Sequence, residues 1–336
     1  MCMKYIILGA FLVTALFSGE ISAQTIHGEP FAHTFSIVAI DSASGEMGVA
    51  VQSHWFSVGS IVAWARPGVG VVATQSLVNV SFGPRGLELM EKGIAPQNAL
   101  QTLLASDKAA GYRQVALLNA KGQIATHTGK ECIAEAGHIV GKTFSVQANM
   151  MLNKKVVPAM AAAFRKAKGP LAERMIAALE AAQKAGGDIR GQQSAAIKIV
   201  KIRPSGKIWE DVVMDLRVED HPQAVQEIAR LVKVYRAYEH MNRGDLAIEK
   251  GDKEAALREY SAAEAMFPKN LEMKFWHAVA LTNIGQLQQA LPLFAQVFSK
   301  DGNYRTLARR LIPNGMLKAS VDDLKRIMNA GIDLRR

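Results

Sequence analysis

Thr34-Phe35-Ser36-Ile37-Val38-Ala39-Ile40 is the first clear secondary-structure pattern after the N-terminal residues. A short apolar run with several β-branched residues is typical of a buried strand. Residues 41–46 then supply the Asp, Ser and Gly of a turn, and the apolar run 47–51 follows. We therefore predict a β-hairpin in which Thr34 is the first residue of the first strand.

Strands and helices occur in groups between residues 34 and 217. Outside the hairpin, strands are predicted at 58–64, 69–75, 114–119, 123–128, 144–150, 194–202 and 207–216, and helices at 85–92, 96–105, 155–167 and 171–185. Because helix pairs separate groups of strands, a simple alternation of single strands and helices is disfavoured. The apolar strand runs also need burial on both faces. We expect an α+β fold, a four-layer sandwich in which a helix pair covers the outer face of each of two packed sheets.

The last third of the chain, residues 222–336, has a helical pattern and contains an internal repeat of 34 residues. Residues 237–270 align with residues 271–304. The alignment places four pairs of similar residues together: Gly251 with Gly285, Ala256 with Ala290, Leu257 with Leu291 and Tyr260 with Phe294. This pattern resembles the tetratricopeptide repeat, with a generic helical hairpin as the alternative. Flanking helices at 222–235 and 305–312 are expected to complete an all-α domain.

Composition and charge limit the function classes. The chain has 336 residues and a formal net charge of +10, but its basic residues are scattered and no basic run is interleaved with aromatics. Nucleic-acid binding is therefore not expected. A Gly-rich phosphate loop is missing, and the spacing of His127, Cys132 and His138 fits no standard zinc pattern. We expect neither a cofactor nor a metal.

The first residues have the pattern of a targeting signal. Lys4 precedes an apolar run at 5–17, and Ile21-Ser22-Ala23 provides small residues for signal peptidase. Residues 1–23 are therefore predicted to be a signal peptide, with an uncleaved membrane anchor as the alternative, and residues 24–33 to be a short leader. We expect export to the periplasm or the extracellular space, without an internal disulfide because Cys132 is the single cysteine after residue 23.

Several stretches between residues 34 and 202 carry a resemblance to a known family. They are TFSIVA (34–39), WARPGVG (64–70), ATQ (73–75), GPRGLEL (83–89), HTG (127–129), AGH (136–138), VQANM (146–150) and GGDIRGQQSAA (186–196). These stretches resemble the family called domain of unknown function 1028, which is grouped with the N-terminal-nucleophile (Ntn) hydrolases. The order of elements also looks like that of a proteasome β subunit.

The resemblance implies a catalytic role for Thr34. In such proteins the threonine hydroxyl attacks a carbonyl carbon, and the free α-amino group of the same residue, with a reference pKa of ~7.7–8.0, takes the proton. Thr34 reaches this state only if the His33–Thr34 bond is cut. Arg66 falls where these proteins usually have a lysine, and since arginine cannot accept a proton, it is expected to orient a carbonyl or to lower the amine pKa. An arginine at the turn before Pro67-Gly68 is the structural alternative.

Further site residues follow from the same resemblance. Asp188 and Ser194 take the positions of the supporting acid and serine, and Asn149 is a candidate donor to an oxyanion. The expected substrate-binding residues are Ser53, His54, Gln75, Gln147 and Arg190. The alternative for Asn149 and Gln147 is a structural residue of the wall whose hydrogen bonds are made within the protein. The alternative for the loop that holds Asp188 and Arg190 is a tight connection without a binding role.

The sequence thus predicts an exported Ntn amidohydrolase or peptidase acting on a small amide or peptide. Its predicted parts are the Ntn-hydrolase-like domain at 34–217 and the tetratricopeptide-like domain at 222–336. The alternative is a catalytically silent Ntn-fold scaffold that binds a protein partner through its helical repeats. A homo-oligomer is left open.

Overall fold

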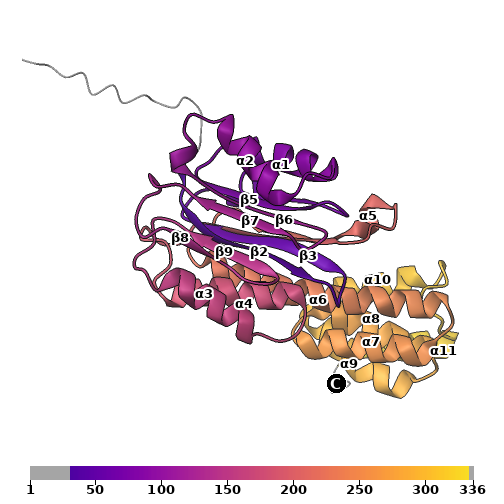
Figure 1. The fold of residues 1–336 in the computed structure, drawn as a ribbon. Helices are drawn as coiled ribbons and strands as arrows, with labels where there is room; N and C mark the ends of the chain where they lie inside the picture. Colours follow the sequence, from indigo (N-terminus) through magenta and orange to yellow (C-terminus); the bar gives the residue numbers. More distant parts are fainter. Residues whose placement is uncertain (1–30, 333–336) are drawn as a thin grey trace, which may run out of the picture.

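The computed structural model describes residues 31–332, so the predicted signal peptide and the leader up to residue 30 lie outside the described residues. Two antiparallel sheets form the first half of this range and helices form the second (Figure 1). No helix in residues 31–332 is long and apolar enough to cross a membrane.

Five antiparallel strands form the first sheet. They are β1 (Phe31–Ala32), β4 (Ala63–Arg66), β5 (Gly70–Leu77), β6 (Arg113–Asn119) and β7 (Ile124–Thr128). The order is β1-β5-β6-β7, and β4 also pairs with β5. The predicted strand at 58–64 is wrong in its first part, because residues 58–60 form a 3-10 turn. Ser57 adopts a left-handed backbone there and its carbonyl accepts hydrogen bonds from the backbone and the hydroxyl of Ser60.

Six antiparallel strands form the second sheet, in the order β11-β10-β3-β2-β9-β8. They are β2 (Thr34–Asp41), β3 (Glu46–Ser53), β8 (Gly137–Val140), β9 (Phe144–Ala148), β10 (Ser194–Lys201) and β11 (Val212–Val218). The predicted hairpin is confirmed, with β2 and β3 in register from Thr34↔Ser53 to Asp41↔Glu46. The predicted strand at 207–216 is wrong in its first part, since α5 (Ile208–Asp211) precedes β11. Asp211 is buried and accepts a hydrogen bond from the Ser205 backbone, which stabilises this local turn.

The two sheets pack face to face, with helices on both outer sides (Figure 1). The pair α1 (Phe82–Glu91) and α2 (Pro96–Ala105) covers the first sheet, and the pair α3 (Val156–Lys166) and α4 (Leu171–Lys184) covers the second. Along β2, Val38 and Ile40 face the first sheet, whereas Phe35, Ile37 and Ala39 face the α3–α4 side. Both faces of β2 are therefore buried, which explains its continuous apolar run.

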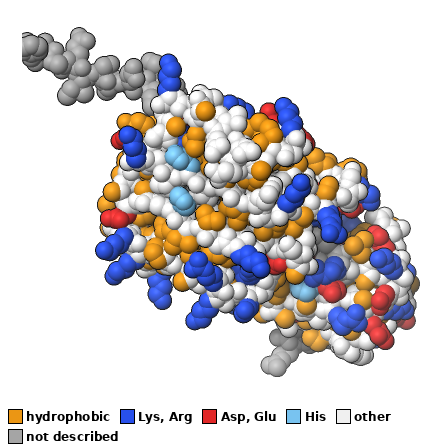
Figure 2. Space-filling model, in the orientation of Figure 1, with side chains coloured by type: hydrophobic (Ala, Val, Ile, Leu, Met, Phe, Trp, Pro, Cys, Tyr) orange, Lys and Arg blue, Asp and Glu red, His pale blue; other side chains and the backbone are white. Residues whose placement is uncertain are grey.

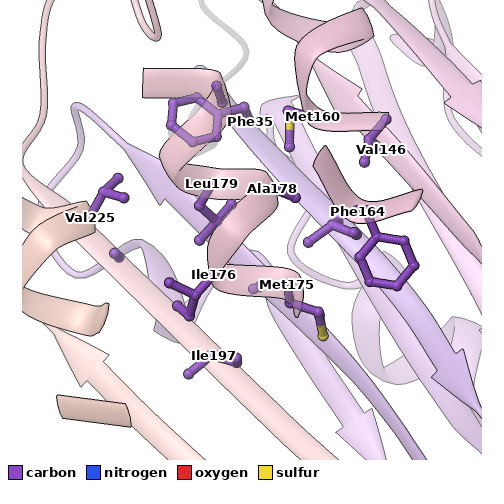
Figure 3. Close-up of a cluster of buried hydrophobic side chains, with 14 of the residues drawn as sticks. Phe35, Val146, Met160, Phe164, Met175, Ile176, Ala178, Leu179, Ile197 and Val225 are labelled. Carbon is purple, nitrogen blue, oxygen red and sulfur yellow. The ribbon is translucent and has the colours of Figure 1, made fainter. Parts of the chain in front are cut away.

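Helix α4 lies at the centre of the largest apolar cluster. Figure 3 shows Ile176 and Leu179 of α4 in a cluster that also contains Phe35 of β2 and Ile197 of β10. The cluster also includes residues from the start of α6 (Ala224–Glu249), namely Ala224, Val225, Ile228 and Val232. The first turns of α6 therefore belong to the core of the sandwich.

The remaining helices form antiparallel hairpins. They are α7 (Lys253–Met266), α8 (Leu271–Asn283), α9 (Leu287–Lys300), α10 (Asn303–Leu311) and α11 (Val321–Asn329). Both ends of α9 lie 34 residues after the corresponding ends of α7, as the repeat requires. The predicted helix at 222–235 does not end there, because α6 continues to Glu249 and its last turns pack on α7.

Candidate functional site

Thr34 is the first residue of β2, a central strand of the second sheet, and its side chain is fully buried. Its hydroxyl donates to the Ala32 carbonyl at 2.6 Å and lies 3.2 Å from the Ser53 hydroxyl. The two residues before Thr34 are buried as well, with Ala32 fully buried and His33 5% exposed. In the uncut chain the candidate nucleophile is therefore closed off from solvent, and its hydroxyl is bonded to the segment that precedes it.

The carbonyl of His33 receives two side-chain donors. The Ser53 hydroxyl donates to it at 2.6 Å and the Arg190 guanidinium at 3.0 Å. This carbonyl belongs to the His33–Thr34 peptide bond, so both donors are placed where negative charge would develop if that carbon were attacked. Donors fixed at such a position are the basis of oxyanion stabilisation.

Asp188 fixes the guanidinium of Arg190. The Asp188 side chain is fully buried, and its carboxylate accepts from the Arg190 backbone at 2.9 Å, from Nε at 3.0 Å and from Nη2 at 2.7 Å. It also accepts from the His54 backbone at 3.4 Å. A buried carboxylate needs such partners, and the paired geometry leaves the arginine little freedom. Asp188 therefore holds Arg190 against the His33 carbonyl.

A chain of buried amides connects the two sheets beside Thr34. Gln75 donates to the Thr34 carbonyl at 3.3 Å and to Gln114 Oε1 at 2.7 Å. Asn149 also donates to Gln114 Oε1, at 2.8 Å, and its own Oδ1 lies 2.8 Å from Nδ1 of His33. Since Nδ2 of Asn149 is directed at Gln114, its Oδ1 must face His33 as an acceptor.

The imidazole of His33 is largely removed from water. Burial is the main effect and holds the pKa of His33 below its ordinary value of 6.5, and Arg190 lowers the pKa further. The hydrogen bond to Asn149 and the charge of Asp188 act in the opposite direction. The ring is therefore neutral near pH 7 and donates its Nδ1 proton to Asn149.

Ser194, Ser53 and Thr34 occupy matching positions on three neighbouring strands. The Ser194 hydroxyl donates to the Trp55 carbonyl and accepts from the Val58 backbone at 3.0 Å. Ser194 thus holds the segment after β3. His54 and Gln147 also lie in this region, but Gln147 donates to Ser36, two residues after Thr34 along β2.

Arg66 is not brought to this site. It pairs in register with Gly70, at the start of β5, whereas Gln75 near the other end of that strand reaches Thr34. Its guanidinium forms a half-exposed ion pair with Glu91 of α1 at 2.5 Å. The expected role of Arg66 beside Thr34 is therefore replaced by a surface contact, and Arg190 supplies the arginine of the site.

The three residues considered for a metal have other partners. His127 bonds to the Ala110 carbonyl at 3.1 Å and His138 to the Thr128 hydroxyl at 2.8 Å. Burial raises the pKa of the Cys132 thiol, whose sulfur lies 3.5 Å from the Arg113 carbonyl. Within residues 31–332 no group of three or more His, Cys, Asp or Glu side chains is arranged to hold a metal ion.

Two site residues were missed by sequence reasoning. His33 precedes the candidate nucleophile and Gln114 fixes the orientation of Asn149, yet neither belongs to a recognisable motif. The signal for Gln114 was its polar side chain at the start of a buried apolar strand, where an unpaired amide would be costly.

The fold and the site together define a mixed α+β protein that has two packed antiparallel sheets, a C-terminal set of helices and a buried threonine at the opening of a central strand. Residues 34–228 match the model described as a family of unknown function (DUF1028), and the chain belongs to this family.

A solved structure supports this assignment. The chain is similar to the crystal structure of protein SPO2555 from Silicibacter pomeroyi, a protein of the same family. The identity is 27% and the TM-score 0.54, over 60% of this chain and 88% of that chain. A comparison with curated proteins gave no match.

Proposed function

We propose that the protein is an Ntn amidohydrolase with Thr34 as its nucleophile. The observation that carries the proposal is the pair of donors, Ser53 and Arg190, on the carbonyl of the bond that precedes Thr34. The two sheets with helices on both outer faces are consistent with an Ntn-hydrolase-like sandwich. The predicted signal peptide would export the protein.

Activation requires the His33–Thr34 bond to be cut. The Thr34 hydroxyl oxygen attacks the His33 carbonyl carbon, the C–N bond breaks and the hydroxyl proton passes to the departing nitrogen. Water then hydrolyses the resulting ester, which leaves a carboxylate on His33 and restores the hydroxyl. The released α-amine, with a reference pKa of ~7.7–8.0, then accepts the hydroxyl proton in each hydrolytic cycle.

Mass determination of the purified full chain tests this proposal. We expect a product that begins at Thr34 in the wild type and in Thr34→Ser, and an uncut chain in Thr34→Ala. Thr102→Ala removes an exposed hydroxyl on α2 and should be cut normally. An uncut wild-type chain without amidase activity would contradict the proposal.

The helical half supports a second candidate function, the binding of a protein partner. A groove of about 530 Å³ is lined by α6, α7, α8 and the segment before α11. Trp276 lines this groove and the adjoining one that contains Tyr238. Asp245, Glu249 and Glu272 line the same surface and form no ion pair with the described residues, and Lys253 and Lys318 also line the groove.

Two of the carboxylates in the groove accept hydrogen bonds from tyrosine hydroxyls rather than from basic side chains: Tyr260 donates to Asp245 and Tyr238 donates to Glu272. Elsewhere on the helices, acids such as Glu239, Glu259 and Glu264 are paired with Arg, His or Lys. Figure 2 shows Lys and Arg spread over both halves of the visible face. A groove that combines acids with aromatic rings favours an extended peptide with Lys or Arg side chains. We therefore propose a basic peptide segment as the ligand of this tetratricopeptide-like half.

Fluorescence anisotropy of the full chain tests the second function. A labelled octapeptide of alternating Lys and Ala should bind, and its Glu–Ala counterpart should not. Asp245→Asn combined with Glu272→Gln should weaken binding about tenfold, while Asp322→Asn, which removes an exposed acid of α11, should not. Equal binding of both peptides, or no effect of the double substitution, would contradict it.

A further inference from the structure

The segment before Thr34 is held as a strand of the first sheet. In β1, Phe31 pairs with Leu77 and Ala32 with Ser76 of β5, in antiparallel orientation. Ser76 has a left-handed backbone with φ 78°, an uncommon conformation for a residue with a side chain. The backbone of β5 therefore departs from regular strand geometry at the residue that pairs with Ala32.

The next residue, His33, fills a polar pocket beside β9. Its Nδ1 lies 2.8 Å from Asn149 Oδ1, and Asn149 is oriented in turn by Gln114. Ala32 is fully buried, so little room remains for a larger side chain at its position. The protein thus binds three consecutive residues of its own chain. Phe31 pairs as a strand residue, Ala32 is small and buried, and His33 donates a hydrogen bond to Asn149.

The chemistry makes this recognition relevant to substrates. When Thr34 cuts its own chain, the intermediate is an ester between the His33 carbonyl and the Thr34 oxygen. A peptide substrate whose acyl part ends in the same residues would form the same ester, since attack by Thr34 breaks its amide bond and expels the amine. Water completes both reactions with a carboxylate product. The place now held by residues 31–33 is therefore the place of the acyl part of a substrate.

We infer that the site hydrolyses extended peptides that pair with β5 as an antiparallel strand. The residue directly before the bond that is cut is a neutral hydrogen-bond donor such as histidine, and the residue before that one is small. This inference rests on the proposed Ntn activity of Thr34. It adds the substrate class and assigns selectivity to Asn149.

The test uses the full chain from Thr34 onward, released from a fusion by a protease and verified by mass. The probes are acetyl-Phe-Ala-His, acetyl-Phe-Ala-Phe and acetyl-Phe-Ala-Asp, each joined to aminomethylcoumarin. We expect kcat/KM for the His probe to exceed that of the other two at least tenfold. Asn149→Ala should reduce the preference of His over Phe to less than threefold, mainly through a higher KM for the His probe. Asn79→Ala, an amide outside the site, should keep it.

The outcomes separate the two claims. Hydrolysis of the Phe or Asp probe at a rate equal to or above that of the His probe overturns the inference and leaves the hydrolase proposal standing. A folded chain that begins at Thr34 and hydrolyses none of the probes, nor general amide substrates, overturns both. Retention of the His preference in Asn149→Ala overturns the assignment of selectivity to that residue.

Discussion

Arg190 is the residue whose side chain most directly links the loop after α4 to the bond before Thr34. Its Nη2 contacts both the His33 carbonyl and Asp188, and a lysine could not make both contacts with the same fork geometry. We predict that Arg190→Lys slows formation of the Thr34 terminus by about 10²-fold, the usual loss for one oxyanion donor. The rate is measured by mass spectrometry of freshly purified chain.

Arg66→Lys provides the matched control for Arg190→Lys. It makes the same arginine-to-lysine substitution at a half-exposed side chain that forms an ion pair with Glu91. The cleavage rate should be unchanged, because exposed ion pairs contribute little and Arg66 does not reach Thr34. Equal slowing of cleavage in both variants would show that Arg190 affects cleavage only through the stability of the fold.

His33 should make the closed arrangement of residues 31–34 sensitive to pH. Its pKa in the folded chain lies below 6.5, mainly because of burial. The detached segment therefore binds more protons below pH 6.5, and stability of the closed form is present above this value and falls with acidification. In uncut Thr34→Ala, amide exchange at residues 31–34 should lose protection between pH 7.5 and 5.5, after correction for intrinsic exchange. The loss should be smaller when His33→Gln is added, and an identical loss would refute the role of the imidazole.

Thr34, Asp188 and Ser194 lie within one region, whereas Arg66 lies outside it. The positions of Thr34 and Ser194 follow from strand order, because both residues begin strands that flank β3. A side chain on a short edge strand such as β4 is harder to place, since its direction depends on where β4 meets β5. The contact between Arg190 and His33 joins residues 157 positions apart and leaves no local pattern.

Gly244 accounts for the close packing of α6 on α7. A Cβ at this position would lie 2.9 Å from two atoms of the Tyr260 ring, which is closer than side chains normally approach. We predict that Gly244→Ala destabilises the helical half by about 1 kcal/mol, because an overpacking cost of 1–3 kcal/mol exceeds the gain of ~1 kcal/mol in helix propensity.

Urea unfolding measures the effect of Gly244→Ala. Gly302→Ala is the matched control, since its added methyl meets no atom within 4 Å. It should change the free energy of unfolding by less than ~0.5 kcal/mol. A gain of stability in Gly244→Ala would mean that the Tyr260 ring moves aside without cost.

Elements with a strong burial signal were predicted well, and weak ones were not. Helix α2 has the predicted bounds, because Pro96 is favourable in a first helical turn and its apolar residues face the sheet. Strand β8 was missed, since Gly137–Val140 alternates between half-buried and exposed positions on the sheet edge. Helix α11 was missed because Ile327 is the only one of its nine residues that is buried.

Helix α6 joins the two halves of the molecule into one structure. Its first turns complete the core around α4, and its last turns pack with α7 and Tyr260. Arg236 in the middle of α6 forms an ion pair with Glu173 of α4 at 2.9 Å. The family match ends at residue 228, inside this helix. The helix is therefore both the last element packed on the sheets and the first of the C-terminal helices.

This shared role predicts how the chain can be shortened. A chain that ends at His221 loses the apolar contacts of Val225, Ile228 and Val232, each fully or almost fully buried against the sandwich. At about 1.5–3 kcal/mol for each side chain, the loss of about 5–9 kcal/mol is comparable with the whole stability of a domain. That chain should aggregate or unfold at a much lower temperature.

A chain that ends at Asn242 provides the comparison, because it keeps these three side chains and the ion pair of Arg236 with Glu173. Its thermal unfolding should remain cooperative, and its Thr34 terminus should form at the rate of the full chain, since the site lies at the far end of β2 from the repeats. Similar midpoints for the two shortened chains would mean that α6 stabilises only the helical half. Loss of cleavage in the longer one would mean that the repeats act on the site itself.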